Sequence, residues 1–139
     1  MRPIFAFIVG LSTTLASVQG ATFVVTNTAA SGSGSLKEAL LAANTSTPPN
    51  TITFNIPGGG TKIIVPDVSM GDLLQPVIID ATTQPGFSNG YPAVWISATG
   101  GTSYGFNIST SNSLLRGLRI TGFGLHGISI LGSSNRVEA

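Results

Sequence analysis

The chain has 139 residues, and only 8% of them are charged, against about 25% in typical globular domains. Its formal net charge of +1 gives no electrostatic reason to expect nucleic acid or an anionic membrane as a partner. It contains no cysteine, which excludes disulfide bonds and thiolate metal sites.

The N-terminus has the features of a secretory signal peptide. Arg2 supplies a positive charge, residues 4–11 are apolar, and small and polar residues follow up to Gly20. The apolar run is far shorter than the roughly 20 residues that cross a bilayer. We therefore expect a signal peptide over residues 1–20 and a mature chain without a membrane span that is secreted or held at the cell surface. The alternative, a buried N-terminal strand or helix, fits this pattern less well.

Residues 21–50 are expected to contain one strand and one helix. The β-branched and aromatic residues 22–26 predict the strand. Ser35 and Glu38 have the spacing of a capping box, in which each side chain bonds a backbone N–H at the start of a helix. About ten helical residues follow, and the prolines at positions 48 and 49 prevent continuation. The apolar residues at helical spacing, which predict one buried face, are Leu36, Ala39, Leu40 and Ala43.

From residue 51 onward the pattern indicates short strands separated by turns. The segment 51–56 alternates polar and apolar residues, as a strand with one buried face does. No second helix is indicated, which argues against a βαβ fold, whose parallel crossovers normally contain helices. The further predicted strands are 62–65, 77–79, 93–97, 106–108, 118–121 and 128–131.

The last third of the chain repeats with a spacing of 22 residues. The segment of alternating residues that begins at Gly105 recurs at Gly127, and the segment that begins at Ser113 recurs at Asn135. Periods of about 20–50 residues indicate units that bury their apolar faces against neighbouring units. We therefore predict an all-β right-handed parallel β-helix with coils of about 22 residues and one short capping helix. The residues assigned to its core in the repeat are Phe106, Ile108, Leu115, Leu118, Ile120, Ile128, Ile130 and Val137.

The segment from Gly34 to Leu40, Gly-Ser-Leu-Lys-Glu-Ala-Leu, resembles a family motif. It is similar to the Cys-Ser-Leu-Arg-Glu-Ala-Ile motif near the N-terminus of secreted bacterial β-helix proteins of the pectin-lyase-like type. The segments 51–57, 79–87 and 116–118 look like the coils that follow it. The resemblance implies a helix that caps the first coil. It implies no particular chemistry, because this architecture serves adhesins, surface repeats, polysaccharide lyases and hydrolases alike.

Three divisions of the chain follow from these expectations. They are the signal peptide 1–20, the strand and capping helix 21–50, and the first coils of the β-helix 51–139. Ala139 falls at the position of Gly117 in the preceding repeat, just before its best strand. We therefore expect the chain to stop in mid-coil and the natural protein to continue into further coils.

The sequence offers no evident catalytic or metal-binding cluster. Asp67 and Asp72 flank a predicted turn and are either turn formers or an acid pair that could hold a hard cation. Asp80 is interpreted as a turn former, and His126 as an exposed turn residue without a nucleophile to activate. We predict no catalytic residue, no metal and no cofactor within this sequence.

Three aromatic residues are the candidates for binding carbohydrate: Phe87, Tyr91 and Trp95. If Val94 and Ile96 point inward, Trp95 must point outward, where it could stack on a sugar ring. The alternative, which the sequence favours, is that the loop 82–92 folds over Trp95 as a small hydrophobic cluster. Arg116 and Arg119 are interpreted as solvated.

Two functions remain. The first is a non-catalytic structural or adhesive segment that contacts a polysaccharide or cell-surface glycan. The second is the N-terminal part of a polysaccharide lyase or glycoside hydrolase whose catalytic acids lie beyond residue 139. The carboxylates of this sequence are scattered, so the sequence favours the first.

Overall fold

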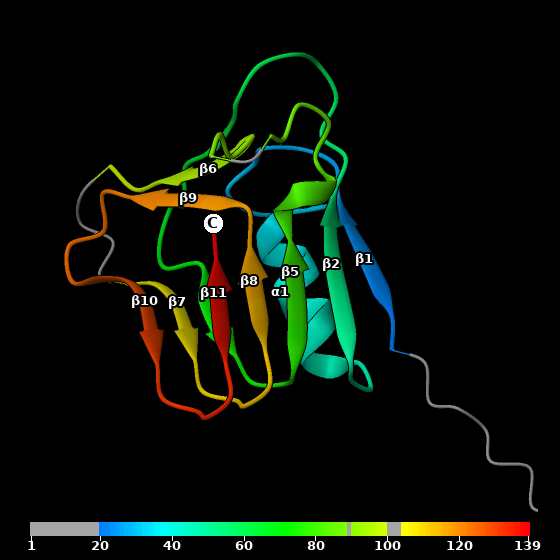
Figure 1. Cartoon of the computed structure of the whole chain (residues 1–139), viewed down its shortest axis with the longest axis vertical. Helices are drawn as coiled ribbons and strands as arrows, with labels where there is room; N and C mark the ends of the chain where they lie inside the picture. Colours follow the sequence, from blue (N-terminus) through cyan, green and yellow to red (C-terminus); the bar gives the residue numbers. More distant parts are fainter. Residues whose placement is uncertain (1–19, 89, 100–103) are drawn as a thin grey trace, which may run out of the picture.

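The computed structural model describes residues 20–88, 90–99 and 104–139 (Figure 1). The predicted signal peptide lies outside these residues except for Gly20. Within the described residues the chain forms one α-helix and three β-sheets. No helix in this part of the chain is long and apolar enough to cross a membrane.

All strand pairs in the three sheets are parallel, and the chain passes through the sheets in turn. Sheet A contains, in spatial order, β1 (Thr22–Val25), β2 (Asn50–Phe54), β5 (Val77–Asp80), β8 (Leu114–Arg116) and β11 (Arg136–Glu138). Sheet B contains β3 (Lys62–Ile64), β6 (Val94–Ser97) and β9 (Leu118–Thr121). Sheet C contains β4 (Gly71–Leu73), β7 (Tyr104–Ile108) and β10 (His126–Ile130).

One apolar core lies between the sheets because alternate residues of each strand point inward. Pairing places Ile52, Ile79 and Leu115 in one row across sheet A, and all three are buried. Sheets B and C contribute similar pairs to the same cluster. These pairs are Ile64 with Ile96 in sheet B and Leu73 with Ile108 in sheet C.

The helix α1 (Leu36–Thr45) closes one end of this core, beside β1 and β2. The predicted start is confirmed, because the Ser35 hydroxyl accepts a hydrogen bond from the Glu38 N–H at 3.2 Å. Glu38 departs from the expected capping box: its carboxylate accepts from the Gly34 N–H at 2.7 Å. The predicted apolar face is also confirmed, since its four residues are buried: Leu36, Ala39, Leu40 and Ala43.

The prediction of an all-β right-handed parallel β-helix with coils of about 22 residues is wrong. The strands belong to separate parallel sheets of five, three and three strands, and a ten-residue helix interrupts the β structure. The number of residues between positions that are hydrogen-bonded across neighbouring segments is not uniform either. It is 29 residues from Ala21 to Asn50 and 36 residues from Val77 to Ser113. The connections differ in length because one contains α1 and another contains the loop between β5 and β6, so no single coil repeats along the chain.

The 22-residue repeat itself is a local feature of the C-terminal third. Phe106 pairs with Ile128 and Leu115 with Val137, and the Ser113 N–H bonds the Asn135 side chain across 22 residues. The earlier member of each pair is buried. Of the eight predicted core residues, the structure buries Phe106, Ile108 and Leu115, half-buries Leu118, Ile120 and Ile128, and leaves Ile130 and Val137 about half exposed.

The predicted strands all exist, with bounds shifted by one or two residues, but β4, β8 and β11 were missed. Each of the three has only three residues, GDL, LLR and RVE, which are too few for an alternation of polar and apolar residues to indicate a strand. The missed β4 begins at Gly71, where a turn was expected. Each of these strands is held by its pairing with a neighbouring strand of the sheet.

Candidate functional site

The outer face of sheet B carries the aromatic residue that was predicted to point outward. In β6, Val94 and Ile96 are buried in the core while Trp95 lies on the opposite face and is half-buried. Strand pairing places Ile63 of β3 on one side of Trp95 and Arg119 of β9 on the other. These three residues form a row across the outside of sheet B.

Two contacts fix the orientation of the Trp95 ring. The guanidinium carbon of Arg119 lies over the ring, 4.2 Å from its centroid, which is the geometry of a cation–π interaction. The indole Nε1–H donates a hydrogen bond to the Thr121 hydroxyl at 2.7 Å. One face of Trp95 is therefore occupied by Arg119, and the ring acts as a support that holds the arginine in place.

Arg119 also lines an open groove of about 500 Å³ on this side of the molecule. Tyr91 lines the same groove and is 77% exposed, so its ring is available for contact. An open concavity with an aromatic ring and a charged donor has the features of a binding site for a polar organic molecule. The other lining residues are small or lack a side-chain charge: Gly60, Thr61, Gly86, Gly90, Pro92 and Ala93.

Phe87, the third predicted carbohydrate-binding residue, lies at a different place. It is half-buried beside Gly117, where an added Cβ would be 3.1 Å from the Phe87 ring and 2.9 Å from the Thr82 backbone nitrogen. Gly117 has a φ of +70°, so a side chain there would be strained as well as crowded. Phe87 thus packs on the turn between β8 and β9, while Tyr91 and Arg119 line the groove.

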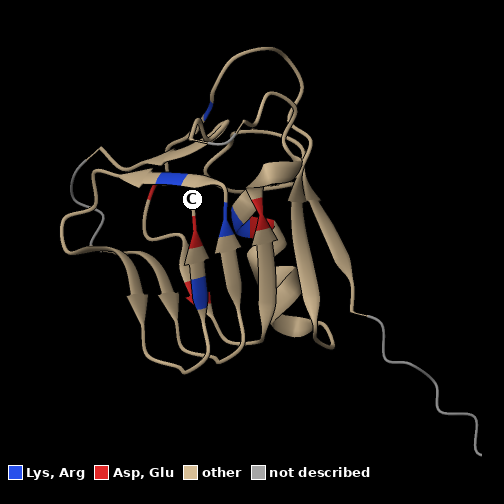
Figure 2. Ribbon diagram, in the orientation of Figure 1, with Lys and Arg blue, Asp and Glu red and all other residues tan. Residues whose placement is uncertain are grey.

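The acidic residues lie on different elements of the fold (Figure 2). Each carboxylate bonds a different residue. A glycosidase needs two carboxyl groups facing one space about 5–9.5 Å across. Asp67 and Asp72, which could have formed an acid pair according to the sequence, bond different residues. Among the described residues no three His, Asp or Glu side chains come together as a metal site. The pairs are Glu38 with the Gly34 N–H, Asp67 with Lys37, Asp72 with Asn107, Asp80 with Arg116 and Glu138 with Arg136.

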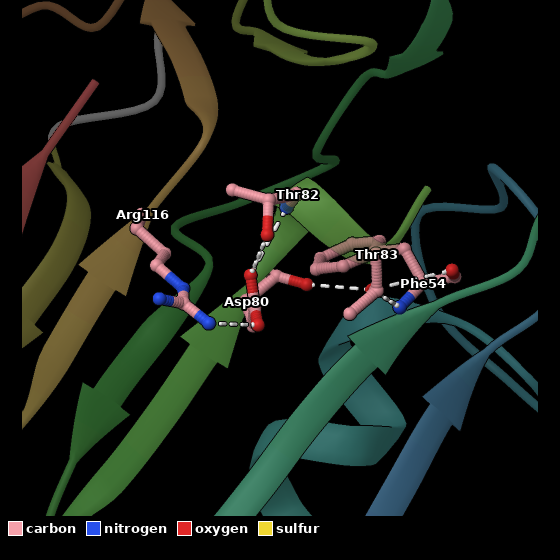
Figure 3. Close-up of polar contacts among 5 residues, drawn as sticks. All are labelled: Phe54, Asp80, Thr82, Thr83 and Arg116. Carbon is pink, nitrogen blue, oxygen red and sulfur yellow. Dashed lines mark hydrogen bonds and ion pairs between the residues drawn. The ribbon is translucent and has the colours of Figure 1, made fainter. Parts of the chain in front are cut away.

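The least exposed of these carboxylates, Asp80, forms a structural ion pair on the outside of sheet A (Figure 3). One of its oxygens accepts from Arg116 at 2.6 Å, and the other accepts from the backbone and hydroxyl of Thr82. The hydrogen bond from Arg116 holds the pKa of Asp80 below its usual range, and the bonds from Thr82 act in the same direction. Asp80 is therefore ionised and fully hydrogen-bonded, which suits it for structure and not for proton transfer.

A second, smaller concavity of about 330 Å³ lies over sheet C. It is lined in part by Asp72, Asn107 and Ser129, which share one row across β4, β7 and β10. His126 begins β10, and its ring lies 6.0 Å from that of Tyr104. His126 is exposed as predicted, but it belongs to a strand and lies beside an aromatic ring.

Arg116 and Arg119, predicted to be solvated, each make a contact that was not predicted: Arg116, whose side chain is 41% exposed, pairs with Asp80, and the exposed Arg119 stacks on Trp95. Arg116 and Asp80 are 36 residues apart. No local pattern links them, because the length of the loop between β5 and β6 sets the register. For Arg119 a signal did exist. Arg119 and Thr121 alternate along β9 as Trp95 and Ser97 do along β6, so the contact between Arg119 and Trp95 was predictable once the pairing of these two strands was known.

Comparisons with protein-family models, with curated proteins and with solved structures gave no match. The resemblance of residues 34–40 to a family motif therefore stays a prediction.

Proposed function

We propose that this chain is a secreted or cell-surface protein segment that binds a glycan without cleaving it, through the groove beside β6 and β9. The observation that carries the proposal is the groove lined by Tyr91 and Arg119, with Arg119 held in place by Trp95. An aromatic ring can stack on the apolar face of a sugar, and a guanidinium group donates several hydrogen bonds to ring and hydroxyl oxygens. The groove thus combines the two kinds of contact that sugars use.

The state of the carboxylates supports a binding role and not a catalytic one. Neither Tyr91 nor Arg119 is among the side chains that the described carboxylates contact. Among the described residues that line the groove there is no carboxylate to protonate a glycosidic oxygen or abstract a proton. A glycan bound in this groove would therefore be held without being cleaved.

Glycan binding is tested with the full chain by affinity electrophoresis against a panel of neutral and acidic polysaccharides. We expect retardation by at least one of them, and Tyr91→Ala should weaken binding about five- to tenfold because one stacking contact is lost. Tyr91 is largely exposed, so this change should leave the thermal unfolding midpoint unchanged. Arg119→Gln should also weaken binding, since it removes the charged donor.

Tyr104→Ala is the matched control, because it removes an exposed tyrosine from sheet C, away from the groove. Equal loss of binding in Tyr91→Ala and Tyr104→Ala would contradict the assignment to this groove. Release of reducing ends or of unsaturated products from any panel member would contradict the non-catalytic role. Secretion is tested separately: the exported protein should begin at Ala21, and export with Met1 still attached would overturn that part of the proposal.

A further inference from the structure

Lys62, the first residue of β3, is a charged residue that the fold buries. It lies on the same face of β3 as the core residue Ile64 and is only 6% exposed. In the described part of the chain no carboxylate forms an ion pair with it. Burying an ammonium group is costly unless other polar groups surround it, so the partners of Lys62 must lie nearby.

The glycine-rich loop before β3 supplies these partners. The Nζ atom donates hydrogen bonds to three consecutive carbonyl oxygens, those of Pro57, Gly58 and Gly59, at 2.5–3.0 Å. An ammonium group has three N–H donors, so all of them are used. Gly58 and Gly60 have positive φ angles of 87° and 72°, which side chains rarely adopt and which let the carbonyls of the loop turn toward one point. The lysine thus holds the loop as a bound cation would.

The same loop forms one wall of the groove described above. Gly60 and Thr61 line that groove. Lys62 is also fixed beside it, because its backbone N–H donates to the carbonyl of Ala93, another lining residue, at 2.7 Å. The buried ammonium group therefore connects the loop 57–61 to the chain that enters β6, on the other side of the groove.

The hydrogen-bonding groups of the loop 57–61 are used unequally. Its carbonyl groups hold Lys62, whereas the backbone N–H groups of residues 58–61 have no acceptor among the described residues. These residues are exposed, so water can bond their N–H groups. A bound molecule that carries oxygen acceptors can take the place of such water. Sugars carry these acceptors on every ring, so the loop can add backbone donors to the guanidinium group of Arg119.

We propose that Lys62 is the positioning residue of the groove: it fixes the loop 57–61 so that the N–H groups of Gly60 and Thr61 donate to oxygen atoms of a bound glycan. Lys62 does not touch the glycan itself, because the loop carbonyls enclose its ammonium group. Without that group the exposed carbonyls turn to water and the loop loses its fixed conformation. This role rests on the proposed glycan binding, but the effect of Lys62 on the loop can be measured without any glycan.

The free protein is tested first, by ¹⁵N relaxation of the full chain. In the wild type the amides of residues 58–61 should be as rigid as those of β3, with order parameters of about 0.85. Lys62→Met removes the charge at similar side-chain length, and the same amides should fall below about 0.6 while those of β5 stay unchanged. Lys37→Met is the matched control, because it removes the same charge from α1 and should leave the loop rigid. A loop that stays rigid in Lys62→Met, or one that is already mobile in the wild type, would overturn the proposal.

Glycan binding is tested second, with cellohexaose as a neutral probe and hexamannuronate as an acidic one. At least one of them should shift the amide signals of Gly60 and Thr61 in the wild type. Lys62→Met should bind that probe about tenfold more weakly, because a mobile loop must be ordered on binding, while Lys37→Met should bind it normally. Tyr91→Ala separates contact from positioning, since it should weaken binding and leave the loop rigid.

The outcomes separate this role from glycan binding itself. A probe that binds the wild type without shifting Gly60 and Thr61, or that binds Lys62→Met as tightly as the wild type, would show that Lys62 does not position the groove. If neither probe binds the wild type, the proposal of glycan binding fails for these sugars, and the positioning role of Lys62 fails with it even where the loop becomes mobile in Lys62→Met.

Discussion

At the scale of single residues, the polar groups of this protein mostly complete the backbone hydrogen bonding of short strands. Gln84 is buried, and its side-chain amide both accepts from the Ile56 N–H and donates to the Ile56 carbonyl. The Gln84 side chain thereby supplies the hydrogen-bond partners that a neighbouring strand would give to the Ile56 backbone. Asp80 caps the turn that follows β5: its carboxylate accepts a hydrogen bond from the Thr82 N–H and pairs with the Arg116 guanidinium. These side chains matter to stability because a buried polar group without a partner costs about 1–3 kcal/mol.

We predict that Asp80→Asn lowers the free energy of unfolding by about 1–2 kcal/mol at neutral pH, the low end for a charged hydrogen bond because Arg116 is partly exposed. The effect should depend on pH. The pKa of Asp80 lies below its ordinary value of 3.8, so the unfolded chain takes up a proton first as pH falls. Its contribution is thus complete well above pH 3.8 and is lost as pH falls through the lower pKa of the folded state.

Urea unfolding of the wild type and Asp80→Asn at neutral and acid pH measures this. The difference between the two proteins should shrink as pH falls below 3.8. Asp67→Asn is the matched control, because Asp67 pairs with Lys37 on the exposed surface and its loss should change stability little. A difference for Asp80→Asn that stays constant down to acid pH would show that the ion pair with Arg116 does not stabilise the fold.

At the scale of elements, the sequence predicted best what is decided locally. The helix α1 and its buried face followed from a capping residue and a spacing of apolar residues, both contained within ten positions. The outward position of Trp95 was predictable for the same reason, since alternation within β6 is local. The strands β4, β8 and β11 were not predictable this way, because each is three residues long and owes its structure to the strand beside it.

We predict that Ser35→Ala destabilises the protein by about 1 kcal/mol, within the range for loss of a helix N-cap. The Ser35 hydroxyl is buried and bonds the Glu38 N–H, and alanine leaves that donor without its partner. Thermal unfolding measures the change, with Ser31→Ala as the control because Ser31 is exposed in the loop before the helix. Equal unfolding midpoints for Ser35→Ala and the wild type would show that α1 does not depend on its cap.

At the scale of the whole molecule, the repeat in residues 105–139 was a true local signal that does not extend to the rest of the chain. Phe106 and Ile128 pair at the expected spacing, but Val77 and Ser113 meet across 36 residues. The overall arrangement depends on loop lengths, and neither periodicity nor composition fixes them. For the same reason the sequence predicted one carbohydrate-binding group of Phe87, Tyr91 and Trp95. In the structure the pairing of β6 with β9 places Arg119 on Trp95, and Phe87 packs beside Gly117 without lining the groove.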